Sequence, residues 1–231
     1  MVLLATNPEV FAFLAALLVG LLHFFGEELE GKIPIDSLIL KSFSAGFTIA
    51  YFFLSMLPEI FENSGFELSF FWVLAGFSLF YVIEEVIYSS SSHMSEVKRE
   101  FKELHSVFLT LYHGCIGLLI YFLAFRSIET ASLFLLPVIG HTFVNSLSIK
   151  QLHEEMLQKS SVKFLASSSP ILGFLIAKFT DLGPQVSYSI FGLVGGMFIY
   201  LVIHDSLSPR KERPLGYLLG VFAFLAIIGL I

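Results

Sequence analysis

The sequence predicts an all-α polytopic membrane protein with eight transmembrane helices. Three observations support this class: the composition, the apolar segments and the placement of the cations. The chain of 231 residues is 56% hydrophobic, and its mean hydropathy is +0.84. Charged residues make up 14%, against about 25% in soluble domains. The composition therefore indicates a lipid bilayer as the surroundings, and no basic stripe suggests nucleic acid as a partner.

Eight apolar segments follow one another, each close to the ~20 residues that a helix needs to cross the hydrocarbon. They cover residues 9–26, 38–60, 67–88, 105–126, 130–150, 162–179, 186–206 and 214–231. The first is interpreted as a retained helix, since a signal peptide would begin with Lys or Arg. The longest connection, 89–104, is polar and is predicted to be a partly helical cytoplasmic loop. Residues 1–231 then form a single transmembrane domain.

The lysines and arginines predict the orientation of these helices. Eleven of the 13 lie in loops after odd-numbered segments or at the adjoining helix ends, whereas only Arg126 and Lys178 follow even-numbered ones. Because cytoplasmic loops are enriched in Lys and Arg, the odd loops are expected in the cytoplasm and both termini outside the cell. The eleven are Lys32, Lys41, Lys98, Arg99, Lys102, Lys150, Lys159, Lys163, Arg210, Lys211 and Arg213.

An internal similarity predicts how the helices are related. The second segment contains "SAGFTIAYFFLSMLPE" and the seventh "GGMFIYLVIHDSLSP"; aligning Gly46 with Gly196 places Ser55 opposite Asp205. The two segments are expected to run in opposite directions. Related segments of opposite direction are typical of an inverted repeat, which predicts that the first three helices superpose on the last three.

The same segments resemble the ZIP (Zrt/Irt-like) family of divalent-metal transporters. The likeness in layout covers nearly the whole chain, and Leu57, Pro58 and Glu59 keep the ending of that family's second helix. The resemblance implies a ZIP-like 3+2+3 inverted-repeat bundle. It also implies a divalent metal as the transported ion, with no prosthetic group.

The resemblance further implies a metal site on the fourth and fifth segments. The family usually carries His-Asn-x-x-Asp-Gly and His-Glu-x-x-His-Glu there, and this chain has "HGCIGL" and "HTFVNS". His113 and His141 are kept, but every carboxylate is lost. Restoring them with Gly117→Asp and Thr142→Glu is expected to strengthen binding. The residues that replace the family's ligands are Gly114, Gly117, Thr142, Asn145 and Ser146.

The depths of the two histidines agree with a shared site. His113 lies eight residues beyond His105, or ~12 Å into the membrane, and His141 nine residues before Lys150, or ~14 Å. Asn145 follows His141 by one turn on the same face. Neutral imidazoles suit zinc and its neighbours, and further ligands are expected from outside these two segments. The candidates are Glu84, His204 and Asp205, while His23 is assigned to the membrane interface.

Each candidate has a plainer interpretation. His113 and His141 would then only hydrogen-bond between helices, and Glu84 and Asp205 would be helix-end carboxylates at the interface. An intramembrane metal hydrolase would need about three histidines and an acid around one zinc. Since only His113 and His141 are deep enough, the chain is not expected to be an enzyme.

Two functions remain open at this point. One is a divergent ZIP-like transporter, multi-pass in the cell membrane, that moves zinc, iron or manganese toward the cytoplasm. The other is a ZIP-fold protein without transport activity that acts as a membrane subunit or regulator. A homodimer is possible in either case.

Overall fold

The computed structural model of the chain describes residues 7–26, 37–64, 66–89, 94–153, 160–180, 182–206 and 213–229. These residues form eight continuous helical segments and no strand. The elements are α2 (Pro8–Phe25), α3 (Ser37–Tyr51), the π-helical turn η2 (Phe52–Met56), α4 (Leu57–Ser64), α5 (Phe66–Ser89), α6 (Met94–Arg126), α7 (Ile128–His153), α8 (Ser160–Phe179), α9 (Pro184–Ser206) and α10 (Pro214–Ile228). The all-helical class is confirmed.

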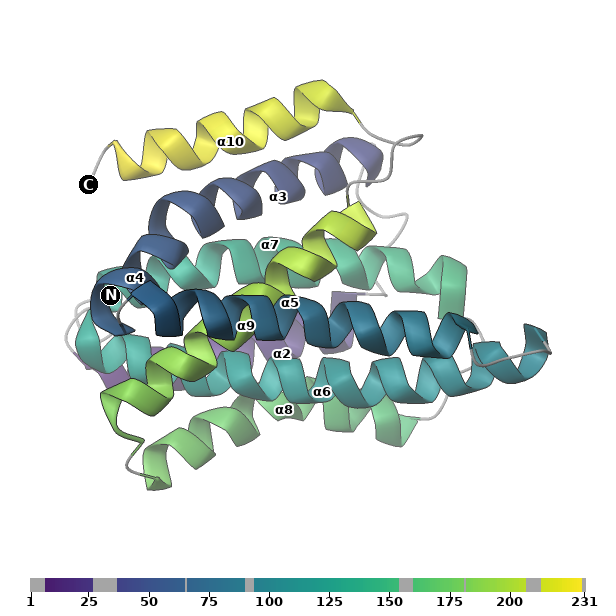
Figure 1. Cartoon of the computed structure of the whole chain (residues 1–231), viewed down its shortest axis with the longest axis horizontal. Helices are drawn as coiled ribbons and strands as arrows, with labels where there is room; N and C mark the ends of the chain where they lie inside the picture. Colours follow the sequence, from purple (N-terminus) through teal and green to yellow (C-terminus); the bar gives the residue numbers. More distant parts are fainter. Residues whose placement is uncertain are drawn as a thin grey trace.

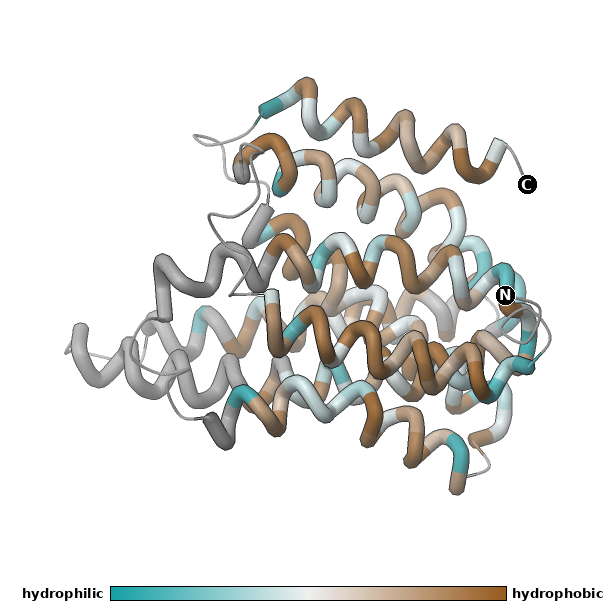
Figure 2. Tube along the Cα trace, turned by 180° about the vertical axis from the view of Figure 1, so that it is seen from behind, coloured by the Kyte–Doolittle hydropathy of each residue, from teal (hydrophilic) through white to brown (hydrophobic). Residues whose placement is uncertain are grey.

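Three helices are long and apolar enough to cross a membrane: Pro8–Phe25, Leu38–Asn63 and Pro184–His204. Four shorter apolar stretches lie in α5, α6, α7 and α10 within the described residues. Large apolar side chains also cover the outside of the bundle, and Phe179 and Leu215 are 78% and 70% exposed. Brown, apolar residues run along most of the helix lengths in Figure 2. A contiguous apolar exterior of this kind fits a lipid environment.

Two helix boundaries differ from the expected ones. Helix α6 begins at Met94, so most of the predicted 89–104 loop has helical backbone. The second segment is one helix from Ser37 to Ser64 that contains the turn η2. Pro58 lies two residues after this turn, and proline removes the amide hydrogen that an α-helix would use at that position. The wider π turn, closed by the Leu57 amide on the Phe52 carbonyl, precedes it.

Three pairs of helices cross at glycines with the same geometry. In each pair a Cβ built on either glycine would meet the carbonyl oxygen three residues before the other glycine, closer than real Cβ atoms approach. Such contacts bring backbones together without side chains between them, and allow weak Cα–H···O contacts. The pairs are Gly46 with Gly220 (α3 and α10), Gly76 with Gly196 (α5 and α9) and Gly117 with Gly173 (α6 and α8).

The helices pack in two groups. The first helix group comprises α2, α6, α7 and α8, with α6 packed extensively on α8 and α2 on both. The second helix group comprises α3 with α4, α5, α9 and α10, built on the α3–α10 and α5–α9 pairs. In Figure 1, α10 lies along α3 at the top, while α8 lies along α6 at the bottom. The groups meet where α7 contacts α3 and where α6 contacts α9 and α5.

The second and seventh segments run in opposite directions. Helix α3 continues into α4 from right to left in Figure 1, whereas α9 rises from the lower left to the upper right. Both belong to the second helix group, where Gly46 and Gly196 each sit at a close crossing. The alignment of these two glycines in the sequence thus joins two positions with the same local packing.

Candidate functional site: a buried histidine layer

Among the described side chains, three histidines are buried inside the bundle, and all come from the first helix group. His23 of α2 is 5% exposed, and His113 of α6 and His141 of α7 are each 4% exposed. These three residues are called the histidine layer below. An imidazole in an apolar interior needs polar neighbours to offset its desolvation, so the neighbours of each ring decide what the layer can do.

His113 meets a histidine from another helix than the one expected. Its ring lies 4.9 Å from that of His23, centroid to centroid, and the two planes are perpendicular. On the far side of His23, Nδ1 lies 3.5 Å from the hydroxyl oxygen of Ser167 in α8. The structure therefore brings α2, α6 and α8 together around a pair of imidazoles and a hydroxyl.

His141 lies at the boundary between the two helix groups. Its ring packs edge-to-face on Phe198 of α9 at 5.2 Å. The preceding residue, Gly140, faces α3, because a Cβ there would lie 3.4 Å from the hydroxyl oxygen of Ser44. His141 thus belongs to the first group by sequence and contacts the second through its side chain.

A strip of polar residues on α3 faces the same boundary. Ser44, Thr48 and Tyr51 are spaced for one helix face, and Tyr51 packs its ring on Phe134 of α7. Thr48 must therefore lie beside the turn of α7 between Phe134 and Gly140. Its hydroxyl is fully buried and has no hydrogen-bond partner among the described residues. Such a group normally binds water or another polar species.

The serines of α8 have a structural role. Pro170 cannot donate a backbone hydrogen bond, which leaves the Ala166 carbonyl without its helical donor. The Ser169 hydroxyl donates to that carbonyl at 2.7 Å. Ser167 likewise donates to the Lys163 carbonyl at 2.7 Å. Their hydroxyl protons are committed to the helix, so these serines can offer a neighbour only their lone pairs.

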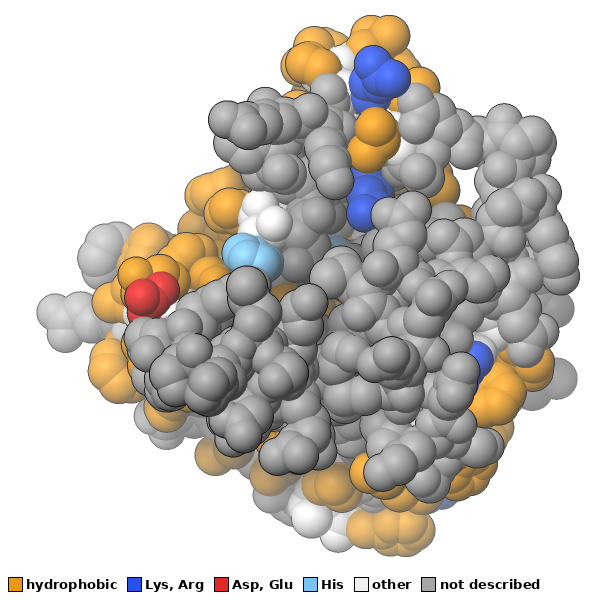
Figure 3. Space-filling model, turned by 90° about the vertical axis from the view of Figure 1, so that its right-hand side faces the viewer, with side chains coloured by type: hydrophobic (Ala, Val, Ile, Leu, Met, Phe, Trp, Pro, Cys, Tyr) orange, Lys and Arg blue, Asp and Glu red, His pale blue; other side chains and the backbone are white. Residues whose placement is uncertain are grey.

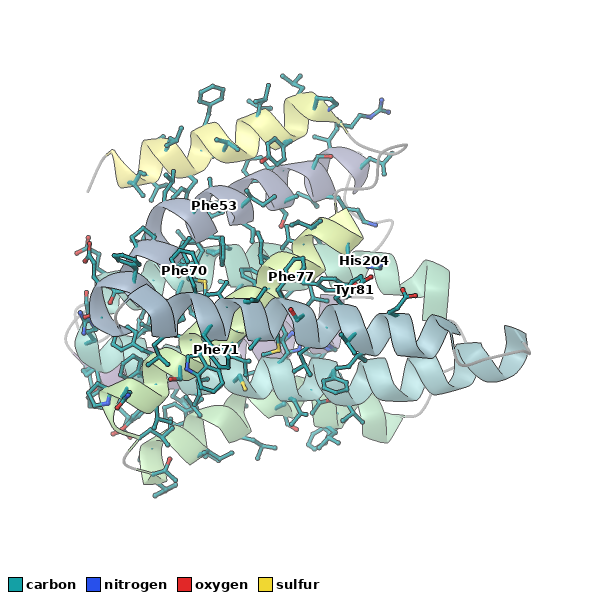
Figure 4. All side chains as sticks on the ribbon, in the orientation of Figure 1. Phe53, Phe70, Phe71, Phe77, Tyr81 and His204 are labelled. Carbon is teal, nitrogen blue, oxygen red and sulfur yellow. The ribbon has the colours of Figure 1, made fainter. Side chains whose placement is uncertain are left out.

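His204 lies away from the layer. It is exposed near the end of α9 and stacks on Tyr200 at 5.8 Å. Tyr200 in turn contacts Phe77 of α5. Figure 4 draws His204 in the region of the α5 residues Phe77 and Tyr81. It belongs to the surface of the α5–α9 pair.

The remaining candidates lie partly outside the described residues. The backbones of Glu84, Asn145 and Asp205 are helical, in α5, α7 and α9, but their side chains are outside the description. Among the described side chains, no three of His, Cys, Asp and Glu gather as a metal site. The expected grouping of His113 and His141 with Asn145 stays a prediction.

The glycine at residue 117 has a structural reason. Gly117 stands where the ZIP family carries Asp, and a Cβ there would meet the backbone of Pro170. An aspartate at this position would drive α6 and α8 apart, so the expectation that Gly117→Asp strengthens binding loses its basis. Gly114 is different, because its Cβ would sit 3.7 Å from the Ser169 carbonyl oxygen, an ordinary contact.

Charged residues gather instead at the helix ends. Glu59 of α4 accepts from Arg126 of α6 at 3.0 Å and from the Tyr188 hydroxyl of α9 at 2.9 Å. Arg126 also donates to Asn63 at 2.6 Å and lies over the Tyr188 ring. These four residues, the Glu59 network, join one helix of the first group to two of the second. Glu59 is thus paired with a cation, which makes it a poor metal ligand.

A second ion pair also lies at the ends of two helices. Lys178, in the last turn of α8, pairs with Glu9 in the first turn of α2. Both cations that follow even-numbered segments therefore have carboxylate partners. Figure 3 shows the opposite end of the molecule, where the described side chains also include Lys or Arg, acidic residues and histidine.

Sequence reasoning missed the contact of His23 with His113. The sequence held one signal, because His23 follows Gly20 by one turn. In the structure a Cβ on Gly20 would meet the Ser167 carbonyl oxygen. A glycine in an apolar helix favours a close neighbour, so the residues one turn away are expected to be buried.

Comparison of the chain with protein-family models, with curated proteins and with solved structures finds no match.

Proposed function

We propose that the chain is a divergent ZIP-like membrane transporter that moves a divalent metal cation toward the cytoplasm. In this proposal its eight helical segments all cross the cell membrane, with both termini outside. Zinc fits best because the buried ligands are imidazoles, while iron and manganese remain candidates. The observation that carries the proposal is the polar boundary between the helix groups, where Gly140 lies against Ser44 of α3 and the neighbouring His141 packs on Phe198 of α9.

The packing supports relative movement of the two groups. Three helix pairs are held by glycine crossings, whereas the α3–α7 contact at the boundary is less extensive than any of these pairs and lies beside buried hydroxyls. Transporters commonly place the substrate between two helix units that rock or slide against each other. A cation bound at the boundary would be carried by the first group past the second.

The glycine geometry supports an inverted repeat. Mapping Gly46 of α3 onto Gly196 of α9 also maps Gly220 of α10 onto Gly76 of α5, and both crossings have the same contacts. This relation is the one expected if the first three segments superpose on the last three. Helices α6 and α7 then lie between the repeats.

A second function is favoured by a different observation. A dication in a low-dielectric site gains most from anionic ligands, and no described carboxylate lies in the histidine layer. A ZIP-fold membrane subunit or regulator without transport activity would not need them. The same protein could bind a metal without releasing it on the other side.

Metal uptake by reconstituted vesicles tests the proposal. Wild type should accumulate Zn²⁺ above the level of protein-free vesicles, and His141→Ala should reduce that uptake at least tenfold. His204→Ala is the matched control, since this histidine is exposed on the second group. If wild type takes up neither Zn²⁺, Fe²⁺ nor Mn²⁺, transport is refuted and the non-transporting function stands.

A further inference from the structure

We infer that His23 and His113 together bind a transition-metal cation of the zinc class, with Nε2 of His23 as one ligand atom. The site lies inside the first helix group, between α2, α6 and α8. The site rests on the proposed function in one respect, because it adds His23 as a ligand to the histidine layer that would hold the transported cation. Its test measures binding alone.

The spacing of the rings fits a shared ion. Zinc binds imidazole nitrogen at about 2.0–2.1 Å in tetrahedral geometry, which places two ring centroids on one ion roughly 5 Å apart. The centroids of His23 and His113 are 4.9 Å apart. Edge-to-face aromatic packing covers the same distance, so a second observation has to separate the two interpretations.

The hydrogen bonding of Ser167 supplies that observation. Its one hydroxyl proton is donated to the Lys163 carbonyl at 2.7 Å. We assign the 3.5 Å contact with His23 Nδ1 as one in which Nδ1 donates its proton and Ser167 accepts it, since the Ser167 proton is already donated. A neutral imidazole with its proton on Nδ1 has its lone pair on Nε2. Metal-binding histidines usually donate their other N–H in this way.

Close backbone contacts hold the pair in place. Gly20, one turn before His23, lies against the Ser167 carbonyl. Gly117, one turn after His113, lies against the Pro170 carbonyl, and Gly173 of α8 against Gly114. The two ligands thus sit on α2 and α6, which backbone contacts hold against α8, and this favours a preorganised site.

The ligand chemistry defines the class of ion. Two neutral nitrogen donors favour zinc, cobalt, nickel and cadmium over magnesium and calcium, which require oxygen ligands. Since no third His, Cys, Asp or Glu joins the pair among the described side chains, water would complete the coordination. Two protein ligands make a weak and exchangeable site, as a transport path requires.

Cobalt titration of the purified full chain in detergent tests the site, with visible absorption distinguishing nitrogen-bound cobalt from the hydrated ion. Wild type should bind, while His23→Ala and His113→Ala should each weaken binding at least tenfold. Ser167→Ala should weaken it roughly tenfold, as loss of an outer-shell partner does. His204→Ala should bind like wild type. If His23→Ala does not fold, His23→Gln keeps a polar side chain of similar size without the imidazole.

The outcomes separate the two proposals. Wild-type cobalt affinity in His23→Ala or His23→Gln, or no nitrogen-bound cobalt in wild type, overturns the site. Cobalt binding that depends on His23 in a protein without uptake supports the site and refutes transport. Uptake that needs His141 but not His23, together with wild-type cobalt affinity in His23→Ala, supports transport and overturns the site.

Discussion

The two helix groups share the same glycine crossings and differ in the polar side chains that they bury. Each contains helix pairs that cross at reciprocal glycines, one pair in the first group and two in the second. The first group buries all three residues of the histidine layer, while the second presents the hydroxyls of Ser44 and Thr48 to the boundary. The crossing therefore builds the scaffold in both groups, and the chemistry depends on what flanks it.

This difference has a consequence for the first group. In the proposed resemblance to the ZIP family, its crossing residue Gly117 takes the place of that family's metal-binding aspartate. A close α6–α8 contact and a carboxylate at this position exclude each other, since the Pro170 carbonyl takes the space of a Cβ. A packing contact thus stands at residue 117 where a carboxylate would add charge, and this contact stabilises the first group.

The largest expected effect comes from returning that carboxylate. Gly117→Asp should destabilise the protein by more than ~3 kcal/mol, because it adds both an overpacked side chain and a buried charge. Gly114→Ala, three residues earlier in α6, should cost less than about 1 kcal/mol, since its Cβ has room. Apparent melting temperature and size-exclusion profile in detergent measure both.

A folded Gly117→Asp variant with wild-type melting temperature would contradict this coupling. In that case α6 and α8 could separate without cost, and the tight crossing would not explain the missing ligand. Thr142→Glu provides the independent route to a carboxylate on α7, next to His141.

A smaller and opposite effect is expected at Thr48 in the second group. Thr48→Val replaces a buried hydroxyl that has no partner among the described residues. Because that hydroxyl is costly to bury, the variant should be equally stable or more stable, by up to about 1 kcal/mol. Metal uptake should nevertheless fall if the hydroxyl serves a passing hydrated cation.

The control for Thr48→Val is Thr180→Val at the exposed end of α8, where the hydroxyl donates to the Ile176 carbonyl. This variant should leave uptake unchanged. Loss of stability in Thr48→Val without change in uptake would show that the hydroxyl has a structural partner and does not line a path.

The sequence predicted the helical class and the number of helical segments because these depend on the apolar runs and on the polar stretches that separate them. It also predicted the related roles of Gly46 and Gly196, since a glycine in an apolar helix has few uses other than close packing. Burial of His113 and His141 followed from their depth. Each of these inferences needs only the neighbours along one helix.

Contacts between helices were harder to predict. Depth counting joined His113 to His141, because both lie near the middle of consecutive segments, but it does not give the direction in which a ring points. The His113 ring packs against His23, which lies in the last turn of α2. The reason for Gly117 was equally hidden, since it depends on the position of Pro170 in a helix more than fifty residues later.

The Glu59 network is expected to have a moderate effect. Its ion pair is part of a set with Tyr188 and Asn63, and the Glu59 side chain is only 22% exposed. Arg126→Met should reduce stability by about 1–2 kcal/mol, because a partly buried carboxylate loses its charged donor. A double-mutant cycle with Glu59→Gln should give a coupling energy of about 1 kcal/mol. Additive effects of the two changes would show that the pair contributes nothing of its own.

The smallest effect is expected for the other cation at the helix ends. Lys178 and Glu9 also form an ion pair, but both side chains are more than a third exposed and no further hydrogen bond to the pair is described. An isolated exposed pair contributes little, because water screens it and two long side chains must be ordered. Lys178→Met should change stability by less than about 0.5 kcal/mol.

The measurement is the apparent melting temperature at low and at high salt, alongside Arg126→Met. Salt should remove the small effect of Lys178→Met and leave most of that of Arg126→Met. An effect of Lys178→Met as large as that of Arg126→Met would mean that the α2–α8 contact depends on this pair and not on the glycine contact at Gly20.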